Sequence, residues 1–398
     1  MTDPWAQFVA AAARSETAGY FERAPDETGR GGYARWFDRA ERLSPVARAG
    51  DLAELRIQVD RYLEGGAGRA AMGYFGFDAY ALFDPGLAPA RRSGPFPLGE
   101  FLLPVRWHRG AARGTDPRRP PFPGALRGRP RRDSLPRPRF EAAVRRLQRE
   151  IRDGEAFQVV LARRREWRRP DDLLARAGRL RAAERFAFFY YLRIGDREIV
   201  GASPEAVVEV AGRRARVHPI AGTLPRRAPP GRGRLHRDPK ELAEHRMLVD
   251  LARNDLGRVS VPGSIRLPWR ERRLRLARVE HLVSRVDGRL ARGRSSWDAL
   301  AATFPAGTVS GAPKLRATEL LRREERTWRG PYAGALGLVG PGGRADWALV
   351  IRSAFAAGSA LYTAAGAGIV YRSVPAREFA ETQAKLAVVE SVVAEAGR

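Results

Sequence analysis

The sequence predicts an α+β protein, because strand-like runs occur next to one another and helix-like segments are grouped between them. The chain has 398 residues, of which 44% are hydrophobic and 9% aromatic, so a sizeable core is available for two modest domains or one large one. Cysteine is absent, which excludes disulfides, thiolate metal sites and a cysteine nucleophile. No apolar run approaches the roughly 18 residues that a membrane span needs.

The spacing of apolar residues predicts the elements in order. Helices are expected over residues 51–63, 140–151, 241–256, 296–304, 315–325 and 377–396. Strands are expected over residues 101–105, 156–161, 186–192, 199–200, 206–210, 336–339, 348–355 and 360–363. The aromatic stretch 72–83 predicts a strand or a strand pair that ends in a loop. The Pro-, Gly- and Arg-rich stretch 109–138 predicts an irregular connection, so we place a boundary between an N-terminal region, 1–135, and a larger domain, 136–398.

The formal net charge is +27, and arginine supplies almost all of the basic excess. Lysine occurs only at positions 240, 314 and 385, so 69 of the 72 basic residues are arginine, and each lysine is a candidate for a chemical role. An arginine-rich nucleic-acid-binding protein is therefore a distant alternative. We favour arginines spread over solvated faces, because they occur throughout and do not interleave with aromatic residues. The N-terminus shows no basic segment followed by an apolar stretch, so we expect a soluble cytoplasmic protein.

Two of the expected helices carry carboxylates three residues apart, Glu241 with Glu244 and Glu378 with Glu381. This spacing places each pair on one helix face, and Lys385 extends the second face by one turn. The pairs are consistent with ordinary helix-surface ion pairs, each contributing roughly 0.2–0.5 kcal/mol. They are equally consistent with oxygen ligands for Mg²⁺, which binds a few carboxylates together with water and an anionic substrate. The spacing alone leaves both interpretations open.

Several ordered segments resemble the chorismate-utilising enzymes, over about residues 137–395 and more weakly at GYFGFDAY (73–80). These segments are GEAFQVVLARR (154–164), ASPE (202–205), PIAGT (219–223), DPKELAEHRMLVDLARNDLGRV (238–259), VEHLVSRVDGRL (279–290), FPAGTVSGAPKLRATELL (304–321), RGPYAGALG (329–337) and AGAGIVYRSVPAREFAETQAK (365–385). The resemblance implies the fold of anthranilate and aminodeoxychorismate synthases, an α/β sandwich of large antiparallel sheets flanked by helices. The domain over 136–398 would then bind chorismate and carry the catalytic residues.

Two positions indicate which branch of the family the chain resembles. Members that use water place a lysine base where this chain has Gln158, which cannot act as a base at neutral pH. Aminodeoxychorismate synthases often place a lysine nucleophile where this chain has Ala221. The resemblance therefore implies amination of chorismate with ammonia and elimination of pyruvate to give anthranilate for tryptophan biosynthesis. Component I of aminodeoxychorismate synthase, in the 4-aminobenzoate and folate branch, is the alternative.

The resemblance also assigns expected roles to individual residues. Mg²⁺ would be held directly by Glu244 and Glu381, with Glu241 and Glu378 as ligands or as water-mediated partners. The expected general acid is Glu205, and the residue expected to remove the C2 proton is His281. A further residue, expected to hydrogen-bond near the substrate as part of the catalytic group, is Thr308. The expected substrate-binding residues are Gly222, Thr223, Tyr332, Arg352, Gly366, Ala367, Gly368 and Lys385.

The family resemblance implies a partner as well. Ammonia would come from a separate glutamine amidotransferase subunit, since that chemistry needs a nucleophilic cysteine and the sequence has none. Homo- and hetero-oligomers both stay open. Feedback inhibition by tryptophan is not expected, because the two segments that bind it in anthranilate synthases correspond here to residues 12–16 and 182–188, which lack the expected side chains.

Overall fold

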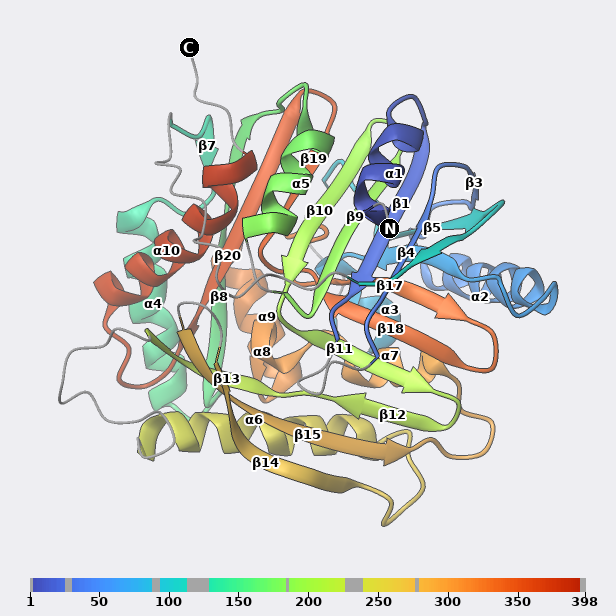
Figure 1. Cartoon of the computed structure of the whole chain (residues 1–398). Coiled ribbons are helices and arrows are strands. Elements are labelled where there is room, and N and C mark those ends of the chain that lie inside the picture. The colour runs from blue at the N-terminus through green and yellow to red at the C-terminus, as the bar shows by residue number, and fades with distance from the viewer. Residues whose placement is uncertain are drawn as a thin grey trace.

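The computed structural model describes residues 3–25, 31–87, 94–112, 129–183, 186–225, 239–275 and 279–393. These residues form two large sheets in which every pairing is antiparallel, with helices packed against them (Figure 1). The α+β fold with large antiparallel sheets flanked by helices is therefore confirmed.

The first sheet runs, in spatial order, through β16 (Gly311–Ala312), β8 (Gln158–Arg168), β20 (Ala360–Ile369), β19 (Ser353–Ala357), β10 (Arg197–Ser203), β9 (Phe188–Ile194), β1 (Thr17–Arg23), β2 (Tyr33–Phe37) and β6 (His108–Gly110), with β7 (Arg132–Asp133) paired to β8. The second sheet runs through β13 (Ile220–Pro225), β15 (Val279–Arg289), β12 (Arg214–Val217), β11 (Ala206–Ala211), β18 (Arg344–Leu349), β17 (Ala335–Gly340), β4 (Ala71–Phe75), β5 (Gly99–Pro104) and β3 (Ala40–Arg42), with β14 (Arg266–Arg275) paired to β15.

The helices of the described residues are α1 (Pro4–Ala12), α2 (Ala49–Glu64), α3 (Tyr80–Phe83), α4 (Arg137–Arg152), α5 (Leu173–Ala183), α6 (Pro239–Gly257), α7 (Ser296–Thr303), α8 (Gly307–Ser310), α9 (Lys314–Glu325) and α10 (Pro375–Val393), together with a 3₁₀ turn at Phe77–Ala79. Helices α1, α5 and α10 lie across one face of the first sheet, and α6 lies along the second sheet beside β14 and β15 (Figure 1).

Strand β9 shows how the first sheet is buried on both faces. Phe188, Tyr190 and Leu192 point into the core that the two sheets share, whereas Phe189 and Tyr191 point into a second core beneath the helices. A strand covered on both sides needs a continuous apolar run rather than an alternating one. The sequence FFYYLRI supplies that run and explains the central position of β9.

Most of the expected elements are confirmed by the structure. The helix expected over 140–151 is α4, which buries Phe140, Val144 and Leu147 at helical spacing. The strand expected over 348–355 is wrong, because it is two strands, β18 in the second sheet and β19 in the first. The break contains Arg352, whose φ of 50° lies in the left-handed region, so the backbone turns there between the sheets.

The N-terminal region contributes strands to both sheets, since β1 pairs with β9 and β4 pairs with β17. The boundary at residue 135 stays a prediction. Much of the irregular connection expected over 109–138 lies outside the described residues. Within the described part of the chain, no helix combines the length and the apolar character that crossing a membrane requires.

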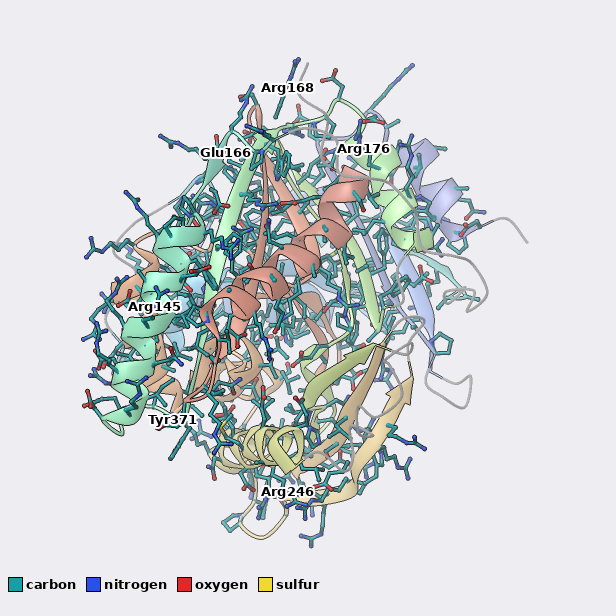
Figure 2. The ribbon with its side chains drawn as sticks, turned by 90° about the vertical axis from the view of Figure 1, so that its left-hand side faces the viewer. Arg145, Glu166, Arg168, Arg176, Arg246 and Tyr371 are labelled. Atoms are coloured by element: carbon teal, nitrogen blue, oxygen red, sulfur yellow. The ribbon has the colours of Figure 1, made fainter. Side chains whose placement is uncertain are left out.

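Arginine side chains are distributed around the molecule rather than confined to one element. The labelled residues Arg145, Arg168, Arg176 and Arg246 come from α4, β8, α5 and α6 and lie at the left, top and bottom of the view in Figure 2. Arginine is therefore not gathered on one face of the fold, and three of these four residues form ion pairs, Arg145 with Glu141, Arg176 with Asp172 and Arg246 with Glu271.

Candidate active site

The chain passes between the two sheets at two adjacent points. One crossing leads from β10 to β11 through Glu205, and the other leads from β18 to β19 through Arg352. The backbone N–H of Leu349 donates to the Glu205 carbonyl at 3.0 Å, and the N–H of Ala202 donates to the Arg352 carbonyl at 3.2 Å. Strand pairing thus brings together two residues that are 147 positions apart in the sequence.

The Glu205 carboxyl group is buried, with 9% of the residue exposed. The hydroxyl of Thr308 donates to its Oε1 at 2.7 Å. Burial raises the pKa of Glu205 to about 7, while the Thr308 hydrogen bond and the positive charges of Arg352 and Lys385 oppose that rise. A carboxyl group with this pKa can donate a proton near neutral pH.

The segment that carries Thr308 is fixed from two sides. On one side, the Arg329 guanidinium donates to the Val309 carbonyl at 2.7 Å. On the other, the buried Lys314 ammonium donates to the Thr303 carbonyl at 3.2 Å and to a carboxylate oxygen of Asp255 at 2.8 Å. The role of Lys314, one of only three lysines, is therefore structural. Its buried ion pair with Asp255 and its bond to Thr303 hold the start of α9 against α6 and the end of α7.

Strand β20 forms the floor beside this segment. A Cβ atom at Gly366 would lie 3.2 Å from the Tyr332 hydroxyl oxygen, and one at Gly368 would collide with the side-chain nitrogen of Gln158. Both glycines therefore keep space open on the same face of the strand. Ala367 lies between them with its methyl group in the hydrophobic core, as alternation along a strand requires.

Two helices bring carboxylates to this glycine strand. From α6, Glu244 accepts a hydrogen bond of 3.0 Å from Nε2 of Gln158, which lies against Gly368. From α10, Lys385 donates to the Gly366 carbonyl at 2.9 Å and pairs with Glu381 at 2.7 Å. Each carboxylate is thus linked to the glycine stretch of β20 through one side chain, Glu244 through Gln158 and Glu381 through Lys385.

Buried contacts hold both helices in place. His245 on α6 hydrogen-bonds through Nε2 to the Ser284 hydroxyl of β15 at 2.7 Å, and burial lowers its pKa to about 4. On α10, the Glu390 carboxylate pairs with Arg165 of β8 at 2.9 Å and accepts from the Thr363 hydroxyl of β20 at 2.7 Å. The carboxylates that α6 and α10 carry are consequently fixed relative to the two sheets.

Tyr332 is buried beside the floor, and burial raises its pKa to about 12, so it is a hydroxyl donor at neutral pH. Arg329, three residues earlier, was not expected from the sequence as a site residue. Its guanidinium forms an ion pair with Glu325 at 2.5 Å and donates to the Val160 carbonyl of β8 at 2.8 Å. The i,i+4 spacing of Glu325 and Arg329 is the signal that could have found this pair, but that spacing is typical of surface pairs.

Three expected site residues are described only through their backbones. Gly222 and Thr223 lie in β13, where the pairing with β15 shifts register between Ala221 and Leu224. His281 lies in β15 opposite Leu274 of β14. The side chains of Thr223 and His281 lie outside the described part of the structure, and the roles of all three residues stay predictions. The same holds for Glu184 and Arg185 of the expected tryptophan-binding segment, which are not among the described residues.

Within the described residues, no three acidic or histidine side chains form a group that could hold a metal ion. Glu241, Glu244 and Glu378 each make further polar interactions. The site therefore combines a buried carboxyl group with raised pKa, one arginine and one lysine cation, a glycine floor and carboxylates on α6 and α10. Such a set can bind an anionic substrate and protonate a leaving group.

A family model described as chorismate binding enzyme matches residues 21–391. The chain belongs to this family. It is similar to component 1 of anthranilate synthase from Methanothermobacter thermautotrophicus, with 46% identity over 262 residues that cover 64% of this chain and 56% of that protein. It is also similar to component 1 of anthranilate synthase from Streptomyces coelicolor, with 46% identity over 287 residues that cover 67% of this chain and 56% of that protein. The chain thus spans little more than half the length of these relatives.

Solved structures show the same architecture. Anthranilate synthase component I from Streptococcus pneumoniae superimposes with a TM-score of 0.73 at 28% identity, covering 93% of this chain and 90% of that one. The menaquinone-specific isochorismate synthase from Escherichia coli superimposes with a TM-score of 0.76 at 20% identity, covering 98% of this chain and 91% of that one, which supports the fold alone.

Proposed function

We propose that this protein converts chorismate and ammonia to anthranilate and pyruvate, with Mg²⁺ as cofactor, as component I of an anthranilate synthase. The observation that carries the proposal is the buried Glu205 carboxyl group, which has a pKa of about 7 and lies against Thr308. Amination at C2 of chorismate must expel the 4-hydroxyl group, which is a poor leaving group unless it is protonated. Glu205 would supply that proton as ammonia attacks C2 and the C4–O bond breaks.

The residue at position 158 supports ammonia as the nucleophile. Gln158 cannot take a proton from water at neutral pH, whereas ammonia attacks through its own lone pair. The side-chain amide nitrogen of Gln158 donates to Glu244, and its Oε1 is buried with no hydrogen-bond partner among the described residues. A buried carbonyl oxygen without a partner is costly, and an N–H group of the nucleophile would satisfy it.

The donor chemistry around the glycine floor fits Mg²⁺. Glu244 and Glu381, with Glu241 and Glu378 one turn away, offer carboxylate oxygens, and Mg²⁺ needs only one or two of them together with water and an anionic substrate. The bound ion would stabilise negative charge on the ring carboxylate of chorismate. The exposed Lys385 would attract the same carboxylate, and Arg352 would offer its two-pronged guanidinium to the other one.

The second half of the reaction removes the C2 proton and breaks the C3–O bond, which releases pyruvate and makes the ring aromatic. The family resemblance assigns the proton removal to His281, on a strand that packs against α6. The hydroxyl group of Tyr332, the backbone at Gly222 and the Thr223 hydroxyl would orient the substrate. The proposed source of ammonia is a separate glutamine amidotransferase subunit, and the proposed pathway is tryptophan biosynthesis.

The test is an incubation of the full chain with chorismate, Mg²⁺ and an ammonium salt. We expect fluorescent anthranilate and an equal amount of pyruvate, with neither formed by the Glu205→Gln variant or without Mg²⁺. Aminodeoxychorismate without pyruvate would contradict the proposal and assign the chain to the 4-aminobenzoate branch. Isochorismate as the product would show that water is the nucleophile and that Gln158 at this position does not prevent its attack.

A further inference from the structure

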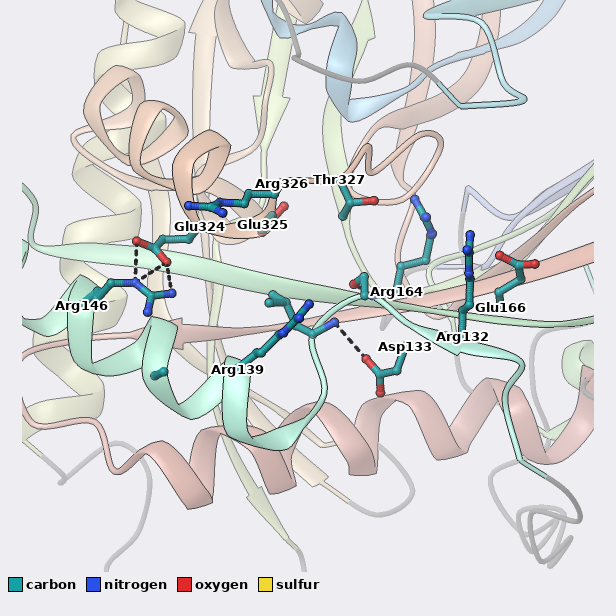
Figure 3. Close-up of a pocket in the computed structure, with 13 residues that line it drawn as sticks. Arg132, Asp133, Arg139, Arg146, Arg164, Glu166, Glu324, Glu325, Arg326 and Thr327 are labelled. Atoms are coloured by element: carbon teal, nitrogen blue, oxygen red, sulfur yellow. Dashed lines mark hydrogen bonds and ion pairs between the residues drawn. The ribbon is translucent and has the colours of Figure 1, made fainter.

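A cavity of about 820 Å³, apart from the candidate active site, lies at the edge of the first sheet (Figure 3). Its walls are α4, β8, the end of α9 and the segment that leads from β7 into α4. None of the residues to which a catalytic, substrate-binding or metal-binding role is assigned above lines it, and Glu325, the partner of Arg329, borders it. The volume lies within the range of about 300–1,000 Å³ that is typical of sites for small molecules.

The outer edge of β8, which borders the cavity, lacks a strand neighbour over part of its length. β16 pairs with Gln158 and Val159, and β7 pairs with Arg165 and Glu166. Between them, side chains take the place of a strand, as three bonds show: the N–H of Ala162 donates to Glu325 at 2.8 Å, the Val160 carbonyl accepts from Arg329 at 2.8 Å, and the N–H of Arg164 donates to the Ser134 hydroxyl at 2.9 Å. The backbone of this stretch is thus bonded to side chains, and the cavity lies beside it, against Arg164 and Glu166.

Most of the carboxylates around this cavity are already neutralised. Glu324 accepts two hydrogen bonds from the Nε of Arg146, at 3.1 and 2.9 Å to its two oxygens, and a third from the same guanidinium at 2.6 Å. Glu325 is paired with Arg329 at 2.5 Å, and Asp133 is paired with Arg163 at 2.8 Å, two arginines that do not line the cavity. Three of the four lining carboxylates therefore contribute little negative charge to the space.

The lining arginines are mostly not neutralised. Among the described residues, no carboxylate lies within ion-pair distance of Arg132, Arg139 or Arg326. Arg164 is held over the Trp328 ring at 3.8 Å and donates to the Trp328 carbonyl at 2.6 Å, so it keeps its positive charge. Four arginines thus face one remaining carboxylate, Glu166, and the cavity has an excess of three positive charges.

Figure 3 shows that these cations come from both sides of the space. Arg326 extends from the end of α9 above it, whereas Arg139 extends from the first turn of α4 below it, with Arg132 and Arg164 at one end. Guanidinium groups bind carboxylate and phosphate oxygens through paired hydrogen bonds, and several of them around one cavity favour a ligand with several anionic groups. An isolated surface arginine would not favour a ligand of this kind.

We propose that this cavity is a binding site for a small polyanion that carries two or more carboxylate or phosphate groups. The site is separate from the chorismate site and does not depend on the proposed function. Arg139 binds the anionic groups from the α4 side, Arg326 from the α9 side and Arg132 from the β7 end.

The experiment is isothermal titration of the full chain with citrate and, separately, with pyrophosphate, at low and at high salt. We expect saturable binding of at least one anion, at one site per chain, that weakens as salt rises. The Arg132→Ser/Arg139→Ser double variant should bind at least about tenfold more weakly, because each lost guanidinium removes charge-assisted hydrogen bonds. Citrate alone, pyrophosphate alone or both would identify carboxylates, phosphates or charge as the chemistry recognised.

Two matched variants distinguish binding in this cavity from attraction to the net charge of the chain and from binding at the candidate active site. Arg149→Ser removes an exposed arginine from the same helix but outside the cavity, and Lys385→Met weakens the candidate active site for anions. Both should bind the anion as the unaltered chain does, within about twofold. The proposal is overturned if neither anion binds, if Arg149→Ser loses as much affinity as the double variant, or if Lys385→Met abolishes the binding.

Discussion

The hydroxyl group of Thr308 donates a hydrogen bond of 2.7 Å to Oε1 of Glu205 and so connects helix α8 to the crossing between the two sheets. This bond stabilises the ionised carboxylate and holds the pKa of Glu205 below the value that burial alone would give. A change in the pKa of Glu205 when Thr308 is replaced therefore measures how much this bond stabilises the carboxylate.

Thr308→Val should move the alkaline limb of the pH profile of kcat/KM to higher pH. In the proposed reaction Glu205 acts in its protonated form, so activity should fall as pH rises through its pKa of about 7, and loss of the hydrogen bond should raise that pKa. We expect a shift of about one pH unit, equivalent to ~1.4 kcal/mol. Thr318→Val, a buried threonine that donates to the Lys314 carbonyl, is the control and should leave the limb in place. A shift toward lower pH would contradict the assignment of Glu205 as the acid.

Glu244→Gln and Glu381→Gln should each reduce turnover to background and weaken Mg²⁺ binding by at least about tenfold. Each change keeps the size of the side chain but removes the charge of a proposed ligand. Calorimetric titration with Mg²⁺ alone checks the binding, and circular dichroism checks that the fold persists. Glu319→Gln, which alters a surface carboxylate paired with Arg316, is the matched control. Near-normal activity in either ligand variant at saturating chorismate would show that the metal assignment is wrong.

His281→Ala should stop the reaction after amination. In the proposed reaction Glu205 acts before pyruvate is lost, so the variant should accumulate an aminated compound that retains the enolpyruvyl group. Mass spectrometry of the reaction mixture identifies this compound. Recovery of unreacted chorismate alone would mean that His281 acts earlier or supports the structure.

Tryptophan should not inhibit the enzyme appreciably. The segment that corresponds to the tryptophan pocket of anthranilate synthases carries Glu184 and Arg185, and burying an unpaired polar group beside an indole costs about 1–3 kcal/mol. That cost corresponds to about a tenfold loss of affinity or more. Titration of tryptophan into the ammonia-dependent assay measures the effect directly. Half-inhibition at low micromolar tryptophan would reveal a site with different residues.

Lys314→Met should destabilise the protein by about 3–5 kcal/mol, because Asp255 would be left buried without its partner. Burial raises the pKa of Asp255 and lowers that of Lys314, and their mutual attraction opposes both shifts. The Lys314→Met/Asp255→Leu double variant should recover most of this loss, since an apolar pair can replace a buried ion pair. Urea denaturation of the three proteins gives the values. Equal losses in the single and double variants would show that the ion pair is not the cause.

Local patterns in the sequence predict much of the fold. The helical spacing of Phe140, Val144 and Leu147 predicts α4, because that pattern depends only on residues within one element. The prediction of one strand over Ala348–Phe355 is wrong, because the chain turns at Arg352 from one sheet to the other. Nothing in the composition of this stretch indicates the left-handed backbone at that residue. That turn is imposed by strands on two different sheets, which is information that a local pattern does not contain.

The candidate site is found through ordered motifs rather than through spacing. Glu205 and Thr308 are 103 residues apart, so no periodicity relates them, and only the resemblance places them in one site. The partnership of Gln158 with Glu244 was not anticipated, because the sequence draws attention to Gln158 only for the base that it replaces. The burial of Arg329 was also missed, since the sequence alone does not separate buried arginines from the many exposed ones.

The position of Glu205 and Arg352 at the two crossings has a consequence for how activity arises during folding. Each residue belongs to neither sheet, and each is placed only when the strands on both sides of it have paired. A folding intermediate with one sheet formed would therefore have secondary structure but no assembled acid–cation pair. Activity should therefore appear during folding only after both sheets have formed and packed against each other.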